Sequence, residues 1–142
     1  MKINIFYNTP LPRYYRVNSK YKNVLLKALG SCARFKGEVS LIITGASEMR
    51  RVNKQFLGHD YVTDTIAFGY PANKKEGAPF GDIFICFAQA KKQAAQHGHS
   101  ALFEMLVLAA HGALHLAGWN DKTTALRQKM NARAESIARE VL

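Results

Sequence analysis

The chain has 142 residues, a typical length for one domain, and 48% of them are hydrophobic while 21% are charged. This composition excludes a disordered or fibrous protein and predicts a globular domain with its own core. Lysine and arginine number 20 against 10 aspartate and glutamate residues, which gives a formal net charge of +10. Such a charge favours a polyanionic partner, although an inert basic surface would have the same composition.

The first half of the chain predicts alternating strands and helices. Residues 1–7 alternate polar and apolar side chains, which is typical of a strand with one buried face. Apolar residues then recur at helical spacing over 17–35 and predict an amphipathic helix. A second strand is expected over 38–43. Ser47 is placed to cap the next helix, whose apolar face carries Met49, Val52 and Phe56.

The second half predicts a strand pair followed by helices. Apolar runs at 63–68 and 82–86 flank a stretch rich in turn residues, so we expect antiparallel strands joined by a mobile loop over 69–80. Helices are then expected over 88–96, 101–117 and 123–142. The middle one is apolar on nearly every face, which predicts a buried central helix. We therefore expect an α+β fold: one domain, residues 1–142, with a mixed sheet of about four strands flanked by helices.

The compartment is predicted from two further features. Cys32 and Cys86 both lie in apolar surroundings, where small buried thiols are common, so we expect them to be reduced. Residues 1–7 do not form the apolar region of a signal peptide, and no apolar stretch is long enough to cross a bilayer. We expect a cytoplasmic protein without a membrane partner.

Two histidines lie four residues apart in the predicted central helix. The imidazoles of His111 and His115 project from one face about one turn apart, so both can reach one metal ion. Gly118 can adopt the left-handed conformation that ends a helix, and the chain could then bring Asp121 to a third ligand position. Three protein ligands and a position open to water are typical of catalytic zinc. The alternative, two core histidines, needs a separate partner for each ring.

Two further positions limit the kind of metal site that His111 and His115 could form. A His-Glu-x-x-His metalloprotease would have its general base directly after the first histidine, where this chain has Gly112. Glu104 precedes His111 by seven residues, about two helical turns. It is therefore too distant to share the ligand set of His111, and we expect it to orient the site or to bind elsewhere.

The segment that contains these histidines, HGALHLAGWND at 111–121, resembles the signature H-G-x-L-H-L-x-G-Y-D-H of the YbeY family of bacterial rRNA maturation factors. Residues 53–68 resemble the family's N-x-x-Y-R-G-x-D-x-P-T-D-V-L-S-F, and Gly81-Asp82-Ile83 is a third match. The resemblance implies a single-strand-specific, metal-dependent endoribonuclease in rRNA maturation and ribosome quality control, usually with Zn²⁺. It implies single-stranded RNA or rRNA as substrate, and ribosomal proteins or a ribosome-associated GTPase as partners.

Two positions depart from the family pattern. The family's third histidine ligand falls on Asp121, a residue that also ligates zinc but lowers the charge of the site and favours harder ions such as manganese. The family's arginine, implied to meet phosphate, falls on Leu57. Another cation would have to replace it. The candidates are Arg50, His59 and Lys54, and the sequence leaves the choice open.

Three hypotheses of function follow. The first is metal-assisted RNA cleavage at His111, His115 and Asp121. The second is a non-catalytic ribosome-assembly factor that binds RNA and uses its metal structurally, which Leu57 favours. The third, hydrolysis of a small substrate, would need a deep apolar pocket. Structural or substrate-groove roles are expected for Asp60, Thr63 and Asp64, on a turn that enters a strand.

Overall fold

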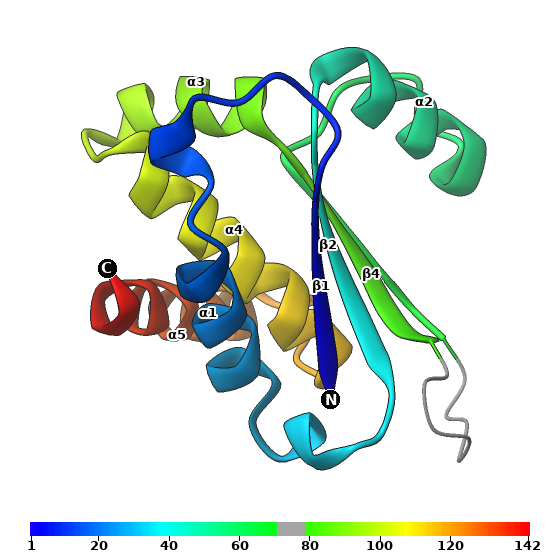
Figure 1. The fold of residues 1–142 in the computed structure, drawn as a ribbon, viewed down its shortest axis with the longest axis vertical. Helices are drawn as coiled ribbons and strands as arrows, with labels where there is room; N and C mark the ends of the chain where they lie inside the picture. Colours follow the sequence, from blue (N-terminus) through cyan, green and yellow to red (C-terminus); the bar gives the residue numbers. More distant parts are fainter. Residues whose placement is uncertain (71–78) are drawn as a thin grey trace.

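A computed structural model of the chain describes residues 1–70 and 79–142 (Figure 1). Most of the mobile loop that the sequence predicts over 69–80 lies outside these residues. The strands are β1 (Lys2–Tyr7), β2 (Glu38–Thr44), β3 (Thr65–Gly69) and β4 (Pro79–Cys86). The α-helices are α1 (Asn18–Leu29), α2 (Ala46–Leu57), α3 (Phe87–His97), α4 (Ala101–Leu116) and α5 (Thr124–Val141).

The strands form one mixed sheet in the order β1-β2-β4-β3. Strands β1, β2 and β4 run parallel, while β3 pairs antiparallel with β4, as expected for that pair. Helices α1, α4 and α5 lie on one face of the sheet and α2 lies on the other (Figure 1). This arrangement confirms the expected mixed sheet flanked by helices.

Helix α4 is the buried centre of the domain, as its apolar composition predicts. Every residue from Leu102 to Leu114 is buried except His111, which is half-buried. The helix packs directly on β4, because a Cβ atom added to Gly112 would lie 2.5 Å from Cγ2 of Ile83. This close approach holds the histidine-bearing end of α4 against the sheet.

Two predicted helix boundaries are wrong. The helix expected over 17–35 ends at Leu29, because Gly30 takes a positive φ of 58° that a helix does not allow, and a short 3₁₀ helix follows at Gly30–Arg34. Cys32 therefore lies in this 3₁₀ helix rather than in α1. At the start of α2 the capping position is Gly45, and Ser47 lies inside the first turn without capping it.

The apolar face predicted for α2 is correct only in part. Met49 and Val52 are buried and pack with Ile66 and Cys86 on the second face of the sheet. Phe56 instead is 59% exposed and packs its ring against Phe68, with centroids 5.3 Å apart. Phe56 therefore packs on a side chain of the edge strand β3 instead of entering the core.

The burial of the two cysteines agrees with the expectation from sequence. Cys86 is buried and Cys32 is half-buried, and neither is in a disulfide.

Across the described ranges, no helix combines the length and the apolar composition that crossing a membrane requires.

Candidate active site

The C-terminal end of α4 reverses the chain as predicted. Gly118 has a left-handed φ of 99°, and its backbone N–H donates to the carbonyl oxygen of His115 at 3.0 Å. The N–H of Trp119 donates to the carbonyl oxygen of Leu114, also at 3.0 Å. These two bonds close the helix end in the way a left-handed glycine permits. The turn leads to Asp121, whose side chain is exposed.

His111 has the properties of a metal ligand. Its Nε2 atom is buried and has no hydrogen-bond partner within the described residues. Burial lowers the pKa of His111 below its ordinary value, and the nearby carboxylate of Asp64 opposes this shift only in part. The ring is therefore neutral near pH 7, and neutral imidazole is the form that coordinates metal ions.

His115 lies one turn further along α4 and is exposed at a pocket of about 500 Å³. The end of α2 also lines this pocket, with Asn53 and Leu57, and β3 lines it with Thr65, Ile66, Ala67 and Gly69. Leu57, which stands where the family signature has arginine, therefore lines the same pocket as His115. The pocket brings α4 together with α2 and β3, which lie much earlier in the sequence.

The three predicted ligands share one end of α4 but do not form the tightest group of metal-binding side chains. His115 and Asp121 both lie close enough to His111 to influence its pKa. In the described ranges, the group whose ligand atoms all lie within 4.8 Å of one another is instead His97, His99 and Glu104. The assignment of His111, His115 and Asp121 as ligands therefore stays a prediction.

The three candidate cations differ in position. Nε of Arg50 donates to Oδ1 of Asp60 at 2.8 Å, which raises the pKa of Arg50 and lowers that of Asp60. Lys54 lies 3.9 Å from the same carboxylate, and neither cation lines the pocket of His115. His59 does line it. Its ring stacks on that of Tyr61 at 5.3 Å between centroids, and its Nδ1 atom lies 3.2 Å from the Tyr61 hydroxyl.

Asp64 approaches His111 from the start of β3, a relationship that sequence reasoning missed. One carboxylate oxygen accepts from the backbone N–H of Thr65 at 2.7 Å, the structural role that its turn position predicts. The other oxygen accepts from Nε2 of Gln93 at 3.2 Å. Asp64 and His111 line a second, smaller cavity of about 220 Å³. Nothing local in the sequence indicates this proximity, because it depends on how β3 packs beside α4.

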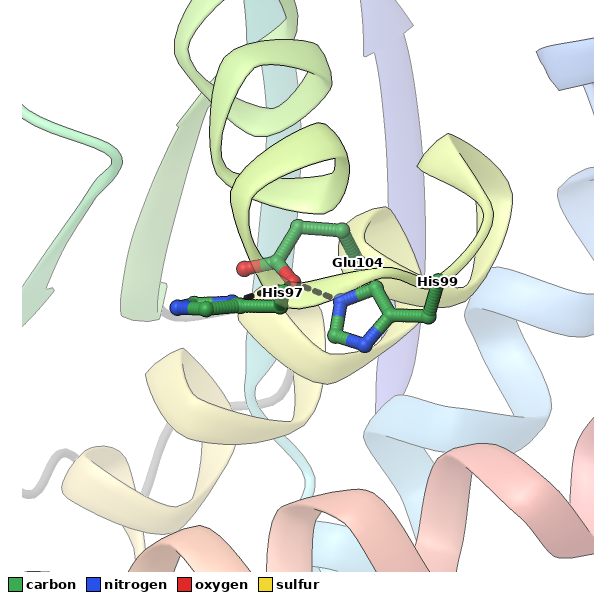
Figure 2. A group of neighbouring side chains, drawn as sticks. All are labelled: His97, His99 and Glu104. Atoms are coloured by element: carbon green, nitrogen blue, oxygen red, sulfur yellow. Dashed lines mark hydrogen bonds and ion pairs between the residues drawn. The ribbon is translucent and has the colours of Figure 1, made fainter.

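Glu104 meets two histidines at this second cavity (Figure 2). Oε2 of Glu104 is in hydrogen-bond contact with Nε2 of His99 and lies 3.7 Å from Nδ1 of His97. Such a group could hold a metal ion. Sequence reasoning missed it, although the His-x-His spacing before the central helix was a signal that could have drawn attention to these residues.

Comparison with known proteins shows which family the chain belongs to. The sequence model described as Endoribonuclease YbeY matches residues 12–141. The chain is 49% identical over 133 residues to Endoribonuclease YbeY of Elusimicrobium minutum, covering 92% of this chain and 93% of the relative. It is 40% identical over 99 residues to the Chlorobaculum tepidum protein of that name, covering 70% of each chain.

A solved structure supports the fold. The solution structure of TM1509 from Thermotoga maritima matches with a TM-score of 0.61 and covers 97% of this chain and 90% of its own. Its sequence identity to this chain is 24%, so this likeness concerns the fold alone.

Proposed function

Because the chain belongs to the endoribonuclease YbeY family, we propose that it is a metal-dependent endoribonuclease that cleaves single-stranded RNA. We extend the proposal to rRNA maturation and ribosome quality control in the cytoplasm. The observation that carries it is the pocket in which His115 and His59 are both exposed, together with His111 one helical turn away, whose buried Nε2 has no hydrogen-bond partner within the described residues. The family match over 12–141 supports treating residues 1–142 as one catalytic domain.

We assign the metal to His111, His115 and Asp121, and we propose Zn²⁺ as the ion, since aspartate also ligates zinc. A buried imidazole nitrogen without a partner is costly unless something binds it, and a metal ion would satisfy it. Two imidazoles and one carboxylate are a known donor set for catalytic zinc. When bound there, a zinc ion supplies Lewis acidity toward a phosphoryl oxygen or a bound water.

The residues around the pocket have separate tasks in this proposal. Of the three candidate cations, His59 is the one that lines the pocket. We assign it either the phosphate contact that the resemblance gives to the family's arginine, or a proton transfer. The hydroxyl of Tyr61 holds Nδ1 of His59, which leaves Nε2 for the substrate. The exposed ring of Tyr61 offers a stacking surface for a base.

The shape of the pocket supports a single strand as substrate. A volume of about 500 Å³ is typical of pockets for small ligands and suits one nucleotide of a flexible strand better than a duplex. Strand β3, which lines it, is at the edge of the sheet. The net charge of +10 favours RNA through its phosphates. Ribosomal proteins or a ribosome-associated GTPase would then direct the enzyme to rRNA.

One observation favours a second function, a non-catalytic RNA-binding factor in ribosome assembly. Leu57 lines the pocket and is 48% exposed, so an apolar side chain occupies the place where the signature has a guanidinium. A missing charge of this kind removes stabilisation of the transition state but leaves RNA binding by the remaining basic surface.

The decisive experiment compares wild type, His115→Ala and Gln128→Ala on single-stranded and duplex RNA of one sequence, with the metal content of each protein measured. Gln128 is an exposed residue of α5 and serves as the control. We expect metal-dependent cleavage of the single strand by wild type and the control, and loss of at least about 100-fold in His115→Ala. Equal cleavage by all three would contradict the proposal, and RNA binding without cleavage by wild type would favour the assembly factor.

A further inference from the structure

A second group of metal-binding side chains lines the same cavity as His111 but contains none of the residues of the family signature. His97 ends α3, His99 follows the left-handed Gly98 in the connecting turn, and Glu104 lies in the first turn of α4. Figure 2 shows both imidazoles turned toward the one carboxylate. Each offers a nitrogen to the same oxygen, Oε2 of Glu104, with the ligand atoms of all three residues within 4.8 Å of one another.

The burial of Glu104 makes this convergence unusual. The residue is only 4% exposed, and a buried carboxylate is costly unless a positive charge compensates it. In the described part of the chain its ion-pair partners are His97 and His99, with no lysine or arginine among them. A divalent cation between them would compensate the carboxylate and bind both rings.

Space and access are suitable for an ion. The three residues line the cavity of about 220 Å³, which is several times the roughly 30 Å³ that one water molecule occupies. The side chain of His97 is 59% exposed, that of His99 27% and that of Glu104 6%, so the group extends from solvent to the interior. An ion can therefore enter past His97.

From this geometry we propose that His97, His99 and Glu104 form a second metal site, which binds a divalent transition ion such as Zn²⁺ and joins the end of α3 to the start of α4. Two imidazole nitrogens and one carboxylate oxygen suit zinc, and water completes its coordination. The site is distinct from the one assigned to His111, His115 and Asp121. It does not rest on the proposed nuclease activity.

The test measures zinc binding by calorimetry and elemental analysis after chelation and dialysis, without RNA. The variants are His97→Gln and His99→Gln, with His59→Gln as a histidine control outside the group. We expect each of the first two to lose one zinc equivalent or at least 10-fold in affinity at one site, while the control matches wild type. The same two variants should lose part of the visible absorption of the Co²⁺-loaded protein.

His115→Ala separates this proposal from the other. That variant should retain the zinc equivalent that depends on His97, whether or not it cleaves RNA. His97→Gln alters an exposed side chain and is expected to fold, and His99→Gln keeps an amide that can donate to Glu104. If His99→Gln fails to fold, His97→Gln decides alone. Zinc stoichiometry and affinity in His97→Gln equal to those of wild type would overturn the proposal.

Discussion

Leu57 and His115 line the same pocket, one at the end of α2 and the other in the last turn of α4. Their separation in the sequence is large, and the sheet between the two helices brings them together. Leu57 is 48% exposed, so a longer side chain at this position has room to reach into the pocket. This relationship makes residue 57 the place where the proposed chemistry can be strengthened.

Replacing Leu57 with arginine should raise the rate of RNA cleavage. A guanidinium beside the scissile phosphate stabilises its developing negative charge, and such a donor contributes roughly 10²–10³-fold in other enzymes. We expect a gain of at least about 10-fold in kcat. Gln55→Arg adds the same charge on an exposed position of α2 outside the pocket, and it should change kcat little. An equal gain from both variants would indicate a general effect of charge.

His59 should matter more than Arg50 for cleavage. Because His59 lines the pocket while Arg50 is held by Asp60, His59→Ala should lower kcat by about 10²-fold, the lower end for a group that transfers a proton. Tyr61→Phe removes the hydroxyl that contacts Nδ1 of His59 and should have a smaller effect of the same kind. Steady-state kinetics on a single-stranded substrate measures both.

Arg50→Gln is the comparison for these variants. It should leave kcat within about 3-fold of wild type, with any change seen in KM at low salt, because exposed charges act mainly on the approach of the substrate. A large loss of kcat in Arg50→Gln together with full activity in His59→Ala would reverse the assignment.

Gly112→Ala should destabilise the fold. The added Cβ would lie 2.5 Å from Cγ2 of Ile83, a branched side chain held in β4 that cannot rotate away. Overpacking of this kind costs about 1–3 kcal/mol, which exceeds the gain of up to about 1 kcal/mol from alanine in a helix. Urea denaturation should show the loss.

A double-mutant cycle with Ile83→Ala checks the cause of that loss. Ile83→Ala alone should cost about 2–5 kcal/mol through the cavity it leaves. Adding Gly112→Ala to it should cost much less than in wild type, because the atoms that clash are gone. Additive effects would show that the contact with Ile83 is not responsible.

Tyr70 should titrate late. Its hydroxyl donates to Oδ2 of Asp82 at 2.5 Å, and this bond, with burial, raises the pKa of Tyr70 to about 12. The folded pKa exceeds the unfolded value of 10.0, so this stabilising contribution is complete below pH 10 and is lost as the pH rises through about 12. Ultraviolet titration of wild type and Tyr70→Phe should differ by one late group. Asp82→Asn should return the pKa of Tyr70 toward 10.0. A pKa of Tyr70 near 10.0 in wild type would contradict the prediction.

The periodicity of the sequence predicted the strands, the buried helix and the antiparallel pair, because burial of one face imposes a repeat that is visible along the chain. It failed where one residue overrides that repeat. Gly30 ended α1 while the apolar pattern continued, since a positive φ breaks the helical backbone whatever the neighbouring side chains are. Phe56 kept helical spacing but stays 59% exposed, because it packs on the ring of Phe68 rather than inside the core.

The candidate site divides in the same way. The spacing of His111 and His115 and the reversal at Gly118 are properties of a single helix, whose rise per residue is constant, so the sequence alone determined them. The positions of Leu57, His59 and Asp64 around those histidines depend on how β3 and α2 meet α4. Local spacing does not contain that information, and only the tertiary structure decided it.

Glu104 illustrates both what the sequence determines and what the tertiary structure decides. Helix geometry predicts its separation from the ligands of His111, since seven residues span about two turns, although both residues line one cavity. What it binds instead was decided by the turn at Gly98, which brings α3 back so that His97 and His99 reach its carboxylate. Sequence determines what one element presents on its faces, whereas the packing of elements determines which faces meet.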